Sequence, residues 1–184
     1  ELGITNFSYF LTEKNFSGKL PNKKVLVIDE AHNLENELTR FIEISISEYF
    51  SEKILSIKIP KDIRTQFQVF NWIKGVYYKK VSSKLEFMTK KINTLGIKNN
   101  LKEFKKLNNQ YEMLKGHVEK LNRFVSIYDK DNWVFDIEEK SGKRRFVFKP
   151  IDISKYAHDY LLNYADFIIF MSATIISHEG FSLT

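Results

Sequence analysis

Two adjacent carboxylates, Asp29 and Glu30, follow directly on an apolar run at residues 25–28, and His32 and Asn33 come next. A continuous apolar run of this kind is typical of a parallel strand buried on both faces. Open α/β sheets bind their ligands at the carboxyl ends of such strands. The pattern therefore predicts a magnesium-nucleotide site at the end of this strand.

The two acids match a known division of labour in nucleotide hydrolysis. One carboxylate helps to hold the magnesium ion on the phosphates, and a second group positions the attacking water. Asp29 fits the first role and Glu30 the second. The alternative is that both acids only open the next helix, whose first turn favours negative charge, and an isolated Asp-Glu pair would favour that alternative.

A second apolar run, at residues 167–171, is followed by Ser172, Ala173 and Thr174. Short hydroxyl side chains can both donate and accept a hydrogen bond, so Ser172 and Thr174 are suited to connecting the acids with another binding surface. We expect the strands at 24–28 and 167–171 to be parallel neighbours in one sheet, although about 140 residues separate them.

The sequence Asp-Glu-Ala-His at 29–32 resembles motif II of superfamily 2 helicases, and Ser-Ala-Thr at 172–174 resembles motif III. The long interval between them resembles the XPD and DinG branch of DNA helicases, which carries an arch domain at this point. The flanking segments at 4–11 and 149–154 resemble the stretches that lead into these two motifs in that branch.

The resemblance implies an α/β fold: part of the first RecA-like P-loop motor domain at 1–56 and 149–184, interrupted by a mainly helical, arch-like module with a β-hairpin at 57–148. It also implies an ATP-dependent helicase that translocates on single-stranded DNA from 5′ to 3′. In this family Asp29 and Glu30 would serve Mg²⁺ and ATP, and His32 would link the γ-phosphate site to the second motor domain. Residues 172–174 would couple hydrolysis to DNA.

The chain has no cysteine, and neither of its Gly-Lys pairs is followed by the Ser or Thr of a P-loop. We therefore expect a fragment of a longer helicase that does not hydrolyse ATP alone. Relatives commonly carry an iron–sulfur cluster, whose cysteines would lie before residue 1. The sequence shows neither a run long enough to span a membrane nor a secretion signal, which favours an intracellular protein, cytoplasmic in a prokaryote or nuclear in a eukaryote.

Positive charge is concentrated in the middle of the chain, where residues 58–130 hold 17 Lys or Arg and 6 Asp or Glu. Clustered cations gain affinity for nucleic acid by releasing counterions from the phosphates, but lysine-rich helices are as often only solvated surfaces. The candidates for contact with single-stranded DNA are Lys79, Lys80, Lys84, Lys90, Lys91, Lys102, Lys105 and Lys106.

Apolar residues recur every three or four positions from Ile63 to Leu95 and again from 97 to 128, with a breaker at 96–100. This spacing predicts two helices that pack as an antiparallel hairpin, in which Gly75 or Gly116 would favour a bend. Alternation at 133–137 and 146–148 predicts a β-hairpin whose aromatic residues pack in the core rather than stack on bases. Strands are also expected near 42–46 and 54–59.

A different class of function fits the same residues. The helical hairpin could belong to a non-catalytic module that binds nucleic acid or protein, with a vestigial Asp-Glu-Ala-His string. A nucleic-acid-independent ATPase is a third alternative. A protein partner on the arch is compatible with each of them.

Overall fold

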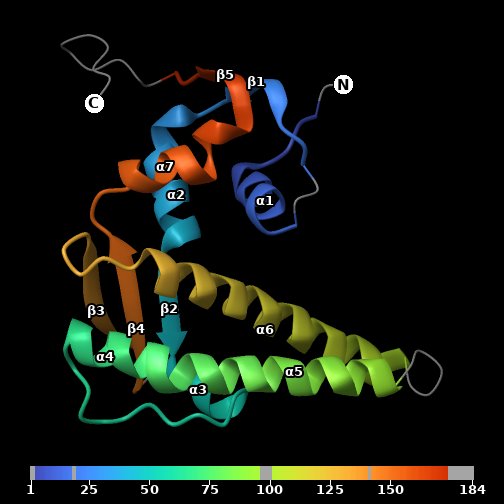
Figure 1. Ribbon diagram of the computed structural model, residues 1–184, viewed down its shortest axis with the longest axis vertical. Coiled ribbons are helices and arrows are strands. Elements are labelled where there is room, and N and C mark those ends of the chain that lie inside the picture. Colours follow the sequence, from blue (N-terminus) through green and yellow to red (C-terminus); the bar gives the residue numbers. More distant parts are fainter. Residues whose placement is uncertain (1–2, 18–19, 96–100, 141, 174–184) are drawn as a thin grey trace. The chain divides into compact units, whose positions relative to one another are not determined.

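The computed structural model describes residues 3–17, 20–95, 101–140 and 142–173 of the chain (Figure 1). It is a mixed α/β structure that divides into two compact units, Glu1–Ile42 with Pro150–Thr184, and Glu43–Lys149. None of the helices in the described ranges is long and apolar enough to cross a membrane.

The first unit is built on two parallel strands, β1 (Lys23–Ile28) and β5 (Ala165–Phe170). Val25 is paired with Phe167, and Val27 with Ile169. The prediction that these distant apolar runs are parallel neighbours is therefore confirmed.

The expectation that the first strand is buried on both faces is wrong for these two strands. Val25 and Val27 are about half exposed, and their partners Phe167 and Ile169 are 70% and 49% exposed. The opposite side of the strands is more enclosed, and Ile28 is 6% exposed. An apolar run thus marks the strand correctly, but only one face of the pair is covered.

Three helices complete this unit: α1 (Phe7–Thr12), α2 (Leu34–Ile42) and α7 (Ser154–Tyr160). Asn6 caps α1 by accepting a hydrogen bond from the backbone of Tyr9 at 2.8 Å. Phe10 packs edge-on against Tyr164, with 4.7 Å between the ring centroids. Because such contacts join the segments before and after the second unit, the first unit has a core of its own.

The second unit contains a three-stranded sheet in the order β2-β4-β3, formed by β2 (Ile44–Ser47), β3 (Trp133–Lys140) and β4 (Lys143–Pro150). β3 and β4 are neighbours joined at Ser141 and Gly142, as the hairpin prediction required. Gly142 has a φ of 68°, a conformation that favours glycine, whereas Ser141 lies outside the described residues.

The boundary expected at residue 57 falls instead at residue 43. β2 pairs antiparallel with β4, with Ile44 opposite Phe148, and α3 (Glu48–Lys53) follows β2. Residues 43–56 therefore belong with the second unit, because their hydrogen bonds are made there. The strand expected near 42–46 is present, whereas residues 54–59 form no strand although Leu55, Ile57 and Ile59 are buried.

An ion pair fixes this irregular segment. The guanidinium of Arg144 lies 3.1 Å from a carboxylate oxygen of Glu48 and also donates to the carbonyl of Pro60 at 3.2 Å. Burial raises the pKa of Glu48, but hydrogen bonds from the backbone and side chain of Arg144 outweigh it and hold the pKa below its ordinary value. The segment after α3 is thus tied to β4.

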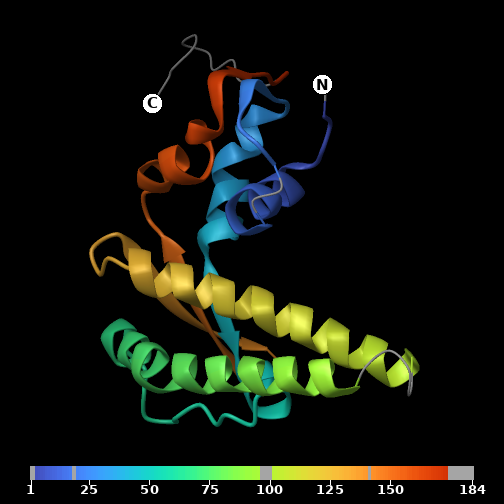
Figure 2. The same ribbon diagram turned by 45° about the vertical axis from the view of Figure 1, so that its right-hand side comes forward.

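The helices of this unit form the predicted hairpin. They are α4 (Gln66–Trp72), a π-helical turn at Ile73–Tyr77, α5 (Tyr78–Leu95) and α6 (Leu101–Ile127). Both views show α5 and α6 side by side and running in opposite directions (Figures 1 and 2). The breaker at 96–100 lies outside the described residues.

The buried stripe differs from the predicted one at its start. The helix begins at Gln66, after Thr65 and Gln68 form a reciprocal capping box. Phe67 lies in this first turn and is 72% exposed, whereas Val69 is fully buried. Of the two glycines, Gly75 lies in the π-helical turn and Gly116 in an uninterrupted helix.

Aromatic side chains fill the space between the sheet and the helices. Phe124 of α6 lies within 5.1 Å of Trp133 and 4.9 Å of Phe148, measured between ring centroids. Trp133 and Phe148 are exposed by 2% or less. The prediction that the aromatic residues of the hairpin pack in the core is confirmed.

A polar pair lies in this core, in which Tyr77 is fully buried and His117 is half-buried. The hydroxyl of Tyr77 lies 2.9 Å from Nε2 of His117. Burial lowers the pKa of His117 to about 4, with a smaller contribution from the charge of Lys120, and burial raises the pKa of Tyr77 to about 12. Both side chains are therefore neutral at pH 7.

This pair predicts that the second unit loses stability in acid. The pKa of His117 is about 4 when folded and 6.5 in the ordinary state, so the unfolded chain binds the extra proton as the pH falls from 6.5 towards 4. We expect the free energy of unfolding to fall by about 1.4 kcal/mol per pH unit, or ~3 kcal/mol across this window. Denaturant titration followed by tryptophan fluorescence measures it, because Trp72 and Trp133 both lie in this unit.

Two variants separate His117 from other sources of pH dependence. His117→Gln keeps a hydrogen-bonding group near Tyr77 but cannot titrate, so the slope between pH 6.5 and 4 should flatten. His158→Gln, at an exposed position of α7, should keep the wild-type slope. An unchanged slope in His117→Gln would contradict the prediction.

Candidate functional site

The two motif strands place their following residues together. Beyond the last paired residues, the amide of Met171 donates to the carbonyl of Ile28 at 2.8 Å, and the amide of Ala31 donates to the carbonyl of Met171 at 2.9 Å. The chain after β5 therefore runs alongside the chain after β1. Asp29, Glu30, His32 and Ser172 are gathered at one edge of the sheet.

Glu30 has a left-handed backbone, with φ 52° and ψ 42°. This conformation costs an L-residue with a Cβ roughly 1–2 kcal/mol. The Asp29 carboxylate accepts a hydrogen bond from the Glu30 amide at 2.9 Å, and both side chains are exposed. The sharp turn separates the two carboxylates from the helix that follows.

The alternative role of these acids, opening a helix, is filled by other residues. Ala31–Asn33 forms a short 3-10 turn, and the amide of Asn33 donates to the carbonyl of Glu30 at 2.9 Å. The acids in the first turn of α2 are Glu35 and Glu37. Glu30 is the N-cap residue of the 3-10 turn, but its side chain makes no capping hydrogen bond, so capping does not explain a glutamate there.

His32 joins the two motifs. Its Nδ1 lies 2.8 Å from Oγ of Ser172 and 3.2 Å from a carboxylate oxygen of Glu30. A carboxylate at this distance favours a proton on Nδ1, because a lone pair there would face negative charge. The N–H at Nδ1 then points between Glu30 and Ser172 and is shared by them. These two residues are 142 positions apart in the sequence.

The carboxylates suit a hard cation that has further ligands of its own. Magnesium in nucleotide sites takes one or two carboxylates and completes its shell with phosphate oxygens and water. No group of three or more His, Cys, Asp or Glu residues in the described ranges could hold a metal by itself. Asp29 and Glu30 are two carboxylates of the kind that could supply protein ligands to such an ion.

The remaining motif residues are placed less fully. Ala173 is exposed, and Thr174 lies outside the described residues. The structure therefore brings together Asp29, Glu30, His32 and Ser172, and the proposed role of Thr174 stays a prediction.

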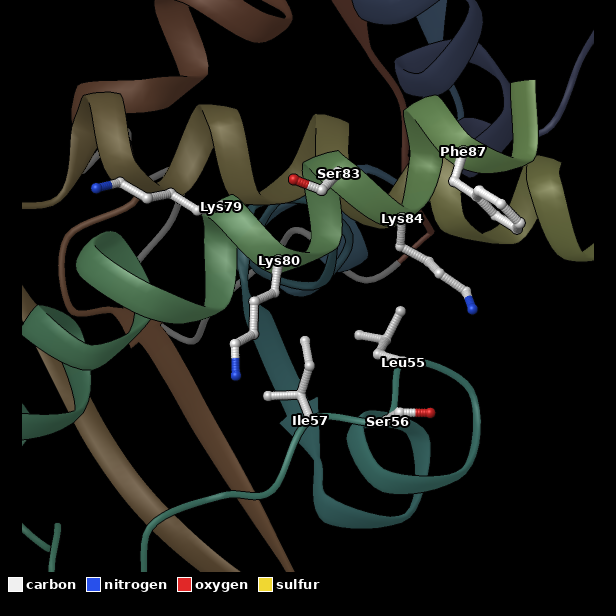
Figure 3. Close-up of a pocket in the computed structure, with 8 residues that line it drawn as sticks. All are labelled: Leu55, Ser56, Ile57, Lys79, Lys80, Ser83, Lys84 and Phe87. Atoms are coloured by element: carbon white, nitrogen blue, oxygen red, sulfur yellow. The ribbon is translucent and has the colours of Figure 1, made fainter. Parts of the chain in front are cut away.

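The eight candidate lysines do not form one cluster. Lys79, Lys80 and Lys84 line a shallow hollow of about 500 Å³ between α5 and the segment after α3 (Figure 3). Lys90 and Lys91 lie further along α5, and Lys102, Lys105 and Lys106 lie on α6, all of them exposed and outside this hollow.

Sequence reasoning missed the other residues of the hollow: Leu55, Ser56, Ile57, Ser83 and Phe87. Phe87 is 60% exposed, and Nζ of Lys84 lies 5.9 Å from the centre of its ring. The spacing of Lys84 and Phe87, three residues apart on a helix, was a usable signal. The contribution of residues 55–57 was not, since it comes from a segment without regular structure.

Comparison with models of known protein families and with curated proteins found no match for this chain.

The backbone of Glu30 yields a prediction that does not depend on function. Glu30→Gly should stabilise the first unit by about 0.5–1 kcal/mol, because glycine removes the left-handed penalty at the cost of greater freedom in the unfolded chain. Hydrogen exchange of the β1 and β5 amides reports the change. Glu35→Gly in α2 is the matched control and should destabilise by about 1 kcal/mol; equal destabilisation by both would contradict the assignment of strain to Glu30.

Proposed function

We propose that this chain is a fragment of an ATP-dependent DNA helicase of the XPD and DinG branch, translocating 5′ to 3′ on single-stranded DNA. The observation that supports it most is the hydrogen bond between His32 and Ser172, at the end of two parallel strands. A strand end with acids on one strand and a hydroxyl on its neighbour is the arrangement that a nucleotide-driven motor needs.

In this proposal Asp29 helps to hold Mg²⁺ and Glu30 orients the attacking water. The magnesium ion and ATP supply charge neutralisation on the phosphates and the phosphoryl group to be transferred. The Asp29 carboxylate accepts a hydrogen bond from the Glu30 amide, and this bond fixes the position of the carboxylate. The left-handed turn at Glu30 aims this side chain separately from that of Asp29.

His32 and Ser172 act as positioning residues. Nδ1 of His32 lies 3.2 Å from a carboxylate oxygen of Glu30 and 2.8 Å from Oγ of Ser172. A movement or a change of charge at the Glu30 carboxylate would therefore shift the imidazole, and with it the Ser172 hydroxyl. Ser172, with Ala173 and Thr174, would carry that change toward bound DNA.

The exposed apolar side of β1 and β5 is consistent with a larger domain in which a further layer of structure covers the sheet. An apolar patch rimmed by polar residues usually marks a surface that another element covers. In the complete RecA-like domain this side would be covered, and the P-loop would come from the same domain. The unit at 43–149 would be the arch-like insertion, the cysteines of any iron–sulfur cluster would belong to another part of the parent, and the protein would work inside the cell.

The competing proposal is a binding module with a vestigial motif. A basic hollow on the second unit favours it, but that hollow is compatible with a helicase too. The decisive difference is whether Glu30 matters for ATP turnover in the complete protein.

In the complete protein, Glu30→Gln should leave ATP binding nearly intact and lower turnover by a factor of 100 or more, since the amide keeps the shape and loses the charge that orients water. Asp29→Ala should weaken Mg-ATP binding instead. Glu35→Gln, on the exposed surface of α2, is the control. Normal turnover by Glu30→Gln would overturn the catalytic assignment and favour the binding module.

Ser172→Ala should separate hydrolysis from movement. The variant loses the hydroxyl that meets His32 but keeps both carboxylates, so most of the ATPase activity should remain while strand unwinding falls at least tenfold. Parallel ATPase and unwinding assays test this. Equal loss of both activities would mean that Ser172 only supports the fold.

A further inference from the structure

The hollow between α5 and residues 55–57 is lined by lysines that lie without acidic partners among the described residues. Several other basic side chains of the unit are paired with acids: Lys143 with Glu52, Arg144 with Glu48, Arg145 with Glu138, and Lys149 with Glu43. In the described part of the chain, Lys79, Lys80 and Lys84 have no acidic side chain within ion-pair distance. Their charge is therefore available to a ligand.

The surroundings of the hollow are poor in negative charge. Residues 53–91 contain ten Lys or Arg but only Asp62 and Glu86 as acids. A potential of this sign attracts anions and raises the rate at which they arrive.

The floor and rim combine apolar and hydroxyl groups. Leu55 and Ile57 are 6% and 2% exposed, and Ser56 and Ser83 are also among the lining residues. Figure 3 shows the side chains of Lys80 and Lys84 extending from α5 toward this segment. Ammonium and hydroxyl groups are both donors to phosphate oxygens.

Phe87 adds an exposed aromatic ring to the hollow. Its ring is 60% exposed at one end of the hollow, beside Lys84. An exposed ring next to cations matches the two parts of a single-stranded nucleotide, because bases stack on aromatic faces while phosphates meet the cations. An acidic peptide would need an apolar side chain at the right spacing to cover the ring, whereas every nucleotide carries a base next to its phosphate.

We propose that this hollow binds single-stranded nucleic acid, with a phosphate held by Lys80 and Lys84 and an adjacent base stacked on Phe87. The inference deepens the proposed function, since it names where the strand would touch the second unit. It also narrows the eight candidate lysines to the three that line the hollow, Lys79, Lys80 and Lys84, and leaves Lys90, Lys91, Lys102, Lys105 and Lys106 outside this site.

The hollow is held in place independently of any ligand. Arg144 donates to the carbonyls of Ile59 and Pro60, just after the segment that forms the floor. Thr65 and Gln68 cap the helix that leads into α5. Both walls are therefore positioned before binding, which lowers the entropy cost of capturing a strand.

The test measures binding of a fluorescein-labelled oligothymidylate to the 184-residue chain by anisotropy, without nucleotide. Lys80→Gln with Lys84→Gln should weaken binding at least tenfold at 50 mM salt and make the slope of log affinity against log salt shallower by about 1.4, which is ~0.7 for each lost contact. The matched control, Lys90→Gln with Lys91→Gln, removes the same charge from the same helix and should change affinity less than threefold.

The aromatic part is tested separately. Phe87→Ala should weaken binding about tenfold, within the range for loss of one stacked base, and leave the salt slope unchanged. Phe67→Ala removes another exposed ring of the same unit and should have no effect. All of these side chains are exposed or half-buried, and tryptophan fluorescence checks that each variant is folded.

Three outcomes would overturn the proposal. Equal loss in the two lysine pairs would mean general attraction to a basic surface. If Phe87→Ala bound the oligonucleotide as tightly as the wild type, no base would be stacked on this ring. Binding of poly-glutamate with the same dependence on Lys80 and Lys84 would assign the hollow to an acidic protein partner. Because these measurements need no ATP, failure here leaves the Glu30 test of the motor proposal untouched, and the reverse holds as well.

Discussion

The pairing of β2 with β4 is the interaction on which the rest of the structure depends. Ile44 lies opposite Phe148, and Nζ of Lys149 lies 4.0 Å from a carboxylate oxygen of Glu43. The two ends of the segment 43–149 are therefore neighbours. Without this closure, β1 and β5 would have to find each other across about 140 residues. With it, the effective connection between them is only about 30 residues, and each halving of a loop lowers its closure cost by ~0.6 kcal/mol.

The same closure explains which features could be predicted from the sequence. β1 and β5 were recognisable because each is a continuous apolar run that ends in chemically distinctive residues. The helical hairpin and the hairpin of β3 and β4 were recognisable because their apolar periods are long and their turns contain glycine. The boundary at residue 43 was not, since β2 is only four residues long and its identity as a strand comes from its partner.

Burial and local backbone were the harder part of the candidate site. Apolar composition does not say how many faces of a strand are covered, so the exposure of Phe167 could not be read from it. The left-handed turn at Glu30 goes against the preference of a glutamate and comes from the tertiary hydrogen bonds around it. The contact between His32 and Ser172 was not expected, since the resemblance assigned His32 a link to the second motor domain, and it depends on how two strand ends far apart in the sequence meet.

The π-helical turn at Ile73–Tyr77 has a consequence for how this protein can vary. Such a turn holds one residue more than the α-helical path would, and it lies between α4 and α5, ahead of the face that carries Lys80, Lys84 and Phe87. Deleting a single residue there would restore a regular helix and leave the residues beyond it facing in nearly the same direction, because the extra residue is the one that the wide turn absorbs. Val69 and Val81, which are both buried, would still lie on one side. The helix can therefore lose one residue in this turn without exposing its buried face, whereas loss of a second residue would rotate everything beyond it by about 100°.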